Sequence, residues 1–238
     1  MTFPVVAAVN YSEETSNTTT HDVLLPASIS AGDLLMLFAG IDGIPTISDM
    51  PAGWTQAKRL VNTGDVNVLE IWYKVAAGGE TDFTYTTSAS EKSANRTWRV
   101  TGHGSAIEVS TGVTASTANP DPDSLAPSWG ALDTLWAVAL TWNNAAATIS
   151  SYPANFTLYQ YSDASGTANS DGTIAIAGRE NNAVSEDPGT FTLSASTATA
   201  VVTVAIKPVV AGGDPEGSLI GGKLIRGGLL KHGVLVRG

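Results

Sequence analysis

Two stretches of the chain repeat one order of residues at a separation of about a hundred positions. The first is Gly32 to Thr55, GDLLMLFAGIDGIPTISDMPAGWT, and the second is Leu132 to Thr157, LDTLWAVALTWNNAAATISSYPANFT. Each has an aspartate (Asp33, Asp133) before an apolar run and a Thr-Ile-Ser triplet that leads into Pro-Ala-x-aromatic-Thr. Because the apolar runs are bounded by Gly, Pro and Asn, they predict strands buried in a core.

The repetition extends beyond these two stretches. The run that begins at Phe83 is matched by the run that begins at Phe191, and the order of the matching segments is preserved along the chain. We therefore interpret residues 3–102 and 104–208 as two diverged copies of one unit. The join between them, Gly102-His-Gly104, indicates a tight turn between strands of one domain.

The composition favours strands over helices. Apolar residues make up 43% of the chain and charged residues 14%, which is poor in the residues that fill exposed helices. The length of 238 residues is sufficient for a substantial core. The prediction is an all-β chain in which residues 1–208 form a jelly-roll-like antiparallel β-sandwich around one shared core. Two immunoglobulin-sized sandwiches, one for each copy, are the alternative.

Strand candidates follow one another at the spacing typical of sandwiches. In the first copy they are Pro4–Val9, His21–Leu25, Leu34–Ile41, Thr55–Val61, Val66–Val75, Asp82–Thr86 and Arg96–Thr101. In the second copy they are Ile107–Ser110, Ser124–Ala126, Leu135–Trp142, Thr157–Tyr161, Thr173–Gly178, Thr190–Leu193 and Ala200–Lys207. Segments rich in Ser, Thr, Asn, Asp and Gly are expected to be loops: Tyr11–Thr20, Thr114–Asp123 and Ser162–Asp171.

Charge is divided unevenly along the chain. Residues 1–217 hold 8 basic and 22 acidic residues, so their net charge is 8 − 22 = −14, whereas residues 218–238 hold four basic residues and no acidic one. Such an acidic body repels nucleic acid, and no nucleic-acid partner is expected. No signal peptide and no run of roughly 18 apolar residues is found, so neither export nor a membrane partner is expected.

The last residues differ from the body. A linker rich in Gly and Pro, residues 209–217, precedes an arm at 218–238 that is built from four pentads, each beginning with two aliphatic residues. A period of five fits neither a helix nor a strand face, so the arm needs a partner to bury its aliphatic side chains. The residues expected to dock are Leu219, Ile220, Lys223, Leu224, Ile225, Arg226, Leu229, Leu230, Lys231, Val234, Leu235 and Arg237.

Catalytic and metal-binding patterns are weak. The three histidines, His21, His103 and His232, lack ligand spacing, and we expect polar positions at sheet edges and a tail cation. The pairs Asp121/Asp123 and Asp163/Asp171 match no calcium-loop pattern, and solvated loop acids are the preferred interpretation. The chain is therefore expected to be non-enzymatic, with no catalytic residue, cofactor or metal.

Two aromatic residues are candidates for a glycan platform. Trp129 and Trp142 lie at strand ends beside polar loops, where an exposed ring can stack on a sugar. The alternative, which holds for aromatics inside apolar runs, is a place in the core.

Several motifs together resemble structural proteins of tailed bacteriophages. They are G-D-L-L-x-x-F, P-A-G-W-T, I-W-Y-K-V-A-A-G-G-E and the terminal G-G-K-L-I-R-G-G-L-L-K-H-G-V-L-V-R-G. The resemblance implies a virion component made in the host cytoplasm: a capsid decoration, head-fibre or tail protein. The expected partners are other virion proteins or sister copies in a homo-oligomer, with the arm as anchor. A carbohydrate- or receptor-binding module that contacts a surface glycan is the alternative function.

Overall fold

The computed structural model describes residues 2–62, 64, 66–144, 146–164 and 171–210, and these residues form fourteen strands and no helix. The first half contains β1 (Val5–Val23), β2 (Leu34–Asp42), β3 (Ile47–Asp49), β4 (Thr55–Val61), β5 (Asn67–Val75) and β6 (Phe83–Thr101). The second contains β7 (His103–Val109), β8 (Val113–Thr117), β9 (Leu132–Trp142), β10 (Ile149–Ser151), β11 (Gln160–Ala164), β12 (Gly172–Ala183), β13 (Thr192–Leu193) and β14 (Thr197–Pro208). The prediction of an all-β chain is confirmed.

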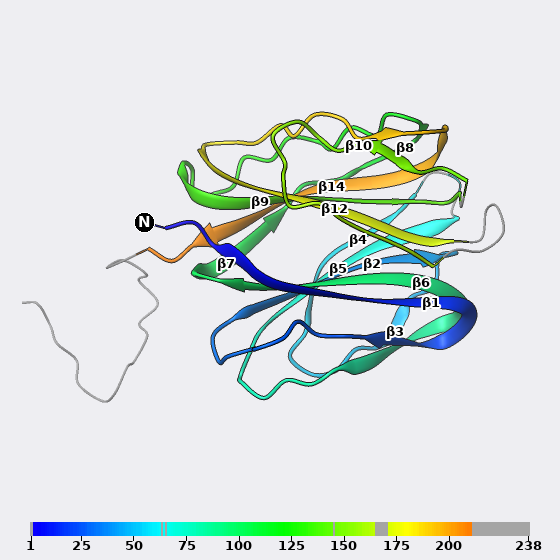
Figure 1. Cartoon of the computed structure of the whole chain (residues 1–238), viewed down its shortest axis with the longest axis horizontal. Coiled ribbons are helices and arrows are strands. Elements are labelled where there is room, and N and C mark those ends of the chain that lie inside the picture. The colour runs from blue at the N-terminus through cyan, green and yellow to red at the C-terminus, as the bar shows by residue number, and fades with distance from the viewer. Residues whose placement is uncertain (1, 63, 65, 145, 165–170, 211–238) are drawn as a thin grey trace, which may run out of the picture.

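The strands form two antiparallel six-stranded sheets that pack face to face, as in a β-sandwich (Figure 1). The order in the first sheet is β1-β6-β2-β5-β4, with β3 paired to β6. The order in the second sheet is β11-β12-β9-β14-β7, with β8 also paired to β14, and β10 and β13 form a separate pair. Each half of the chain therefore builds one sheet, and the chain passes between the sheets at Gly102, whose φ is +70°.

The core between the sheets takes side chains from both halves. Met36, Phe38 and Trp98 of the first sheet meet Ile174 and Ile176 of the second in one fully buried cluster. The outer face of each sheet has an apolar cluster of its own, which loops and short strands cover. Apolar burial at this scale is the main favourable term in folding, and here it is divided over three layers of side chains.

Some predicted boundaries are confirmed and others are wrong. Leu34–Ile41 lies within β2 and Thr55–Val61 coincides with β4. The loop predicted at Tyr11–Thr20 is instead part of β1, which turns back on itself where its register with β6 shifts, between Glu14 and Thr20. Hydrogen bonds to β6 on both sides of this bend hold the polar residues in strand conformation, because paired backbone groups outweigh the turn preference of single residues.

The second half shows similar departures. The predicted loop Thr114–Asp123 begins inside β8, and β11 begins at Gln160 rather than at Thr157. Ser124–Ala126 forms only an isolated bridge, Leu125 to Glu186. The short strands β3 and β10 were not predicted, because three residues are too few to show a period of two.

Candidate binding surface

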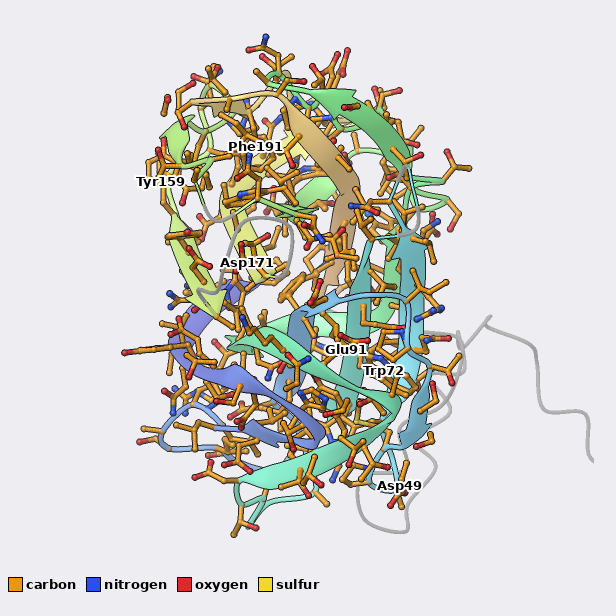
Figure 2. The ribbon with its side chains drawn as sticks, turned by 90° about the vertical axis from the view of Figure 1, so that its right-hand side faces the viewer. Asp49, Trp72, Glu91, Tyr159, Asp171 and Phe191 are labelled. Atoms are coloured by element: carbon orange, nitrogen blue, oxygen red, sulfur yellow. The ribbon has the colours of Figure 1, made fainter. Side chains whose placement is uncertain are left out.

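The outermost strands β1 and β11 come together on one side of the sandwich. β1 ends the first sheet and β11 ends the second, and the two strands contact each other (Figure 2). The backbone N–H of Asp163 on β11 donates a hydrogen bond to Oε1 of Glu13 on β1, at 3.2 Å. This side of the molecule therefore exposes residues from both halves of the chain.

Tyr11 on β1 is the first element of this surface. Its partner across the ladder is Arg96 of β6, whose guanidinium carbon lies 4.7 Å from the centroid of the Tyr11 ring. A cation over an aromatic face is attracted by the ring quadrupole, so the ring is held in place while the Tyr11 residue stays 51% exposed. Burial lowers the pKa of Arg96, and the nearby charge of Glu13 opposes this effect.

A second aromatic group comes from the second half of the chain and includes Tyr159, next to the start of β11. The rings of Tyr152 and Tyr159 stack with their centroids 4.4 Å apart and an interplanar angle of 20°. Tyr159 is 51% exposed and lies at the outline of the molecule in Figure 2. Burial raises the pKa of Tyr152, and the positive charge of Arg96 opposes the rise.

A hollow of about 470 Å³ adjoins Tyr11, along the bend of β1. Its lining residues are Asn10, Tyr11, Ser12, Glu13, Glu14, Asp22 and Leu24. The bend is fastened by hydrogen bonds from Asn10 Nδ2 to Leu25 O at 2.9 Å and from Ser12 Oγ to Asp22 O at 2.5 Å. We call Tyr11, Arg96, Tyr152, Tyr159 and this hollow the tyrosine edge.

The tryptophans predicted as a glycan platform do not belong to this surface. Trp142 is fully buried, and its Nε1 donates to Ala147 O at 3.0 Å while its ring stacks on Tyr161. The prediction of an exposed Trp142 is therefore wrong, because the residues after the strand fold back over the ring. Trp129 is half-buried against the outer cluster of the second sheet, and its Nε1 donates to Thr134 Oγ1 at 3.0 Å.

Sequence reasoning missed the tyrosine edge. The sequence predicts a loop at Tyr11, and nothing in it signals that Arg96 faces this residue from β6. The sequence signal for a strand at Tyr11 is short: apolar and polar residues alternate only over Val9-Asn10-Tyr11-Ser12. The docking residues of the arm, from Leu219 to Arg237, lie outside the described residues.

Two of the carboxylates considered as calcium ligands accept hydrogen bonds within the protein. Asp123 accepts hydrogen bonds from Ser110 Oγ, Thr111 Oγ1 and the backbone N–H of Gly112, so it organises a turn. Asp163 accepts a hydrogen bond from the Tyr161 hydroxyl at 2.7 Å. Burial raises the pKa of Asp163. Among the described residues, no group of three or more His, Cys, Asp or Glu is arranged to hold a metal ion.

His21 contacts a serine, but deep inside the protein. Its Nδ1 lies 2.8 Å from Ser93 Oγ and its Nε2 lies 2.9 Å from Thr87 Oγ1, and the ring stacks on Tyr85. His21 and Ser93 are both fully buried, so no substrate can reach them, although a serine beside a histidine is the pattern of an activated nucleophile. Burial lowers the pKa of His21 to about 4, and the neutral ring is a structural element.

The remaining histidines do not extend this site. His103 in β7 bridges two carbonyl oxygens, those of Gly104 and Gly32, at 2.7 and 2.8 Å. His232 lies outside the described residues. In the described part of the chain no helix is long and apolar enough to cross a membrane.

No protein-family model, curated protein or solved structure matches this chain.

Proposed function

We propose that the chain is a non-enzymatic structural protein of a bacteriophage particle, a capsid decoration, head-fibre or tail component anchored through residues 218–238. The observation that carries this proposal is the segregation of charge and apolar residues in the sequence. The arm holds four cations and nine aliphatic residues beside a body of net charge −14. An arm of this composition gains free energy by burying its aliphatic side chains against a partner, and its cations complement acidic groups on that partner.

The polarity of the sandwich supports an anchored display. β14 ends at Pro208, and Val209 N donates to Gly102 O at 3.0 Å, at the end of the molecule where β1 begins (Figure 1). β1 bends back at the opposite end (Figure 1). The last described residues after β14 and the bend of β1 therefore lie at opposite ends of the sandwich (Figure 1).

We infer that the sandwich consists of two diverged copies, each building one sheet. Matching hydrogen bonds support this inference: Ser88 N donates to Thr46 O at 2.9 Å, and Ser194 N donates to Thr148 O at the same distance. The strand order is also the same in both sheets when the β7/β8 segment is matched to β1. The resemblance to a jelly roll is then limited to the packing of two antiparallel sheets.

A second candidate function is a carbohydrate- or receptor-binding module. It is favoured by one observation, the half-exposed Tyr11, which lines a hollow together with polar residues. Binding sites combine apolar surface with a few well-placed polar groups. The two candidate functions are compatible, because a displayed virion protein can bind a host surface.

Deletion of residues 218–238 tests the anchor. We expect the full chain to form oligomers or to bind particles, as measured by light scattering and negative-stain microscopy. The truncated chain should remain a folded sandwich that neither oligomerises nor binds particles. A matched variant in which Lys223, Arg226, Lys231 and Arg237 are replaced by Gln should weaken attachment mainly at low salt, where charge attraction is least screened. Normal assembly of the truncated chain would overturn the anchor and leave the sandwich as the assembly surface.

A further inference from the structure

We infer that the tyrosine edge binds a neutral saccharide, with Tyr11 and Tyr159 as stacking surfaces and the carboxylates of the β1 bend as hydroxyl acceptors. This inference rests on the second candidate function, and its test does not involve the arm.

The aromatic groups have the geometry that a sugar ring needs. Arg96 covers one face of Tyr11 at 4.7 Å and Tyr152 covers one face of Tyr159 at 4.4 Å, yet each exposed tyrosine remains 51% accessible. In both cases a neighbouring side chain contacts the ring while about half of the tyrosine residue stays exposed. Tyrosine contributes apolar contact area at a small cost in side-chain entropy, and the apolar C–H face of a sugar pyranose is the complementary shape.

The polar groups around the hollow determine which ligands fit. Glu13, Glu14 and Asp22 line it together with Asn10 and Ser12. The Asn10 amide and the Ser12 hydroxyl already donate to backbone carbonyls, and one oxygen each of Glu13 and Glu14 already accepts from a backbone N–H. Ionised carboxylates only accept hydrogen bonds, so a ligand must bring donors. Sugar hydroxyls are such donors, and a volume of about 470 Å³ lies within the ~300–1,000 Å³ typical of small-molecule sites.

The same carboxylates exclude two competing ligand classes. Glycans with sialic or uronic acids are disfavoured, because three carboxylates line the hollow and residues 1–217 carry a net charge of −14. Proline-rich peptides also dock on aromatic grooves. However, proline lacks the backbone N–H, so a proline-rich peptide offers mainly carbonyl acceptors. These cannot form hydrogen bonds with the carboxylate acceptors of the hollow.

The test is a glycan array that carries neutral glucans, mannans and galactans together with sialylated and uronate oligosaccharides. The array is probed with the full-length chain. We expect binding to a subset of the neutral glycans. Tyr11→Ala and Tyr159→Ala should each weaken it about tenfold or more, as expected when a stacking contact is lost. Tyr11→Phe, which keeps the ring, should retain most of the affinity. Glu13→Gln should weaken binding without changing the preference for neutral glycans.

The matched control is Val184→Ala, because Val184 is 65% exposed and follows the end of β12 remote from β11. It should bind like the natural protein, and all variants should show the same melting temperature. No binding to any neutral glycan, binding to acidic glycans alone, capture of a proline-rich peptide instead, or equal losses in the Val184→Ala control would each overturn the proposal. None of these results bears on assembly through the arm, which the truncation measures separately.

Discussion

The two sheets share a strand order, but their central strands, β2 and β9, place their largest side chains on opposite faces. Leu34 pairs with Val100 in the first sheet and Leu135 pairs with Ile206 in the second. From this common register, Phe38 on the inner face corresponds to Ala139. On the outer faces the larger side chain belongs to the second sheet: Trp142 of the second sheet corresponds to Ile41 of the first. Two sheets of one topology can thus share a dense core when bulk on one side meets small residues on the other.

Glycines allow a close approach between the two sheets. A Cβ atom at Gly40 of β2 would lie 1.7 Å from the backbone oxygen of Thr173, and one at Gly172 of β12 would lie 2.7 Å from Gly40 O. Backbones in direct contact leave no room for a methyl group, whereas Trp98 and Phe38 separate the sheets elsewhere in the core. The distance between the sheets is therefore set at this point by the absence of side chains.

Gly40→Ala is expected to have the largest effect on this shared packing. Because the clash is with backbone rather than with a flexible side chain, we expect a loss of roughly 4 kcal/mol or more in the free energy of unfolding, or failure to fold. The matched control is Gly178→Ala on β12, where the nearest atoms, at 3.0 to 3.2 Å, belong to the side chains of Leu158 and Trp98. That change should cost about 1 kcal/mol. Urea denaturation measures both, and equal costs would contradict sheet packing at Gly40.

The aromatic residues after Pro-Ala-x sharpen the comparison of the outer faces. Phe156 is fully buried, whereas Trp54 is half-buried and tilts against Phe83 with ring centroids 5.2 Å apart. Phe156→Ala should therefore cost about 3–5 kcal/mol, and Trp54→Ala about half as much, since less apolar area is lost from the fold. Thermal and chemical melting give the two values. A larger loss of stability for Trp54→Ala than for Phe156→Ala would show that burial does not determine the cost of these two substitutions.

The smallest of the three expected effects is a pH dependence that originates in the first half. Burial lowers the pKa of His21 from 6.5 to about 4, with the charge of Asp22 opposing this effect. Between these values the unfolded chain binds more protons than the folded one, so stability falls as the pH decreases from 6.5 to 4. The contribution is ~3 kcal/mol at most.

Unfolding titrations between pH 7 and pH 4 measure this slope. His21→Gln should remove the part of the pH dependence of the free energy of unfolding that comes from His21, because glutamine does not titrate. This holds whatever the variant's stability at pH 7. An unchanged slope in the variant would show that other groups cause the acid sensitivity.

The strands that the sequence predicts best are those with continuous apolar runs. Leu34–Ile41 is buried along its whole length in β2, so its continuous apolar run correctly predicts a strand buried on both faces. The polar halves of β1 and β6 carry no such pattern, and their strand conformation depends on pairing with each other. The register of the strands could not be predicted from the sequence either. An alignment of Asp33 with Asp133 is one residue out of step with the ladder that pairs Leu34 with Val100 and Leu135 with Ile206, and one residue reverses the face.

The candidate site was less predictable than the fold. The tyrosine edge combines Tyr11, Arg96 and Tyr159 from three segments, which only the pairing of β1 with β6 and the contact of β1 with β11 bring together. Trp142 illustrates the converse. A polar Asn-Asn pair follows it and suggests exposure, yet the chain returns to cover its ring and accept its N–H.

The long pairing of β1 with β6 also determines how the protein would bear a mechanical force. Val5 to Glu14 pairs with Thr101 to Ser93 along the length of the sandwich, and the last described residues of β14 lie at the end where this ladder begins (Figure 1). A pull between an anchor after β14 and a ligand at the β1 bend would run along the strands, perpendicular to their inter-strand hydrogen bonds. Inter-strand hydrogen bonds of β1 that carry this load would be strained together in shear instead of breaking one at a time.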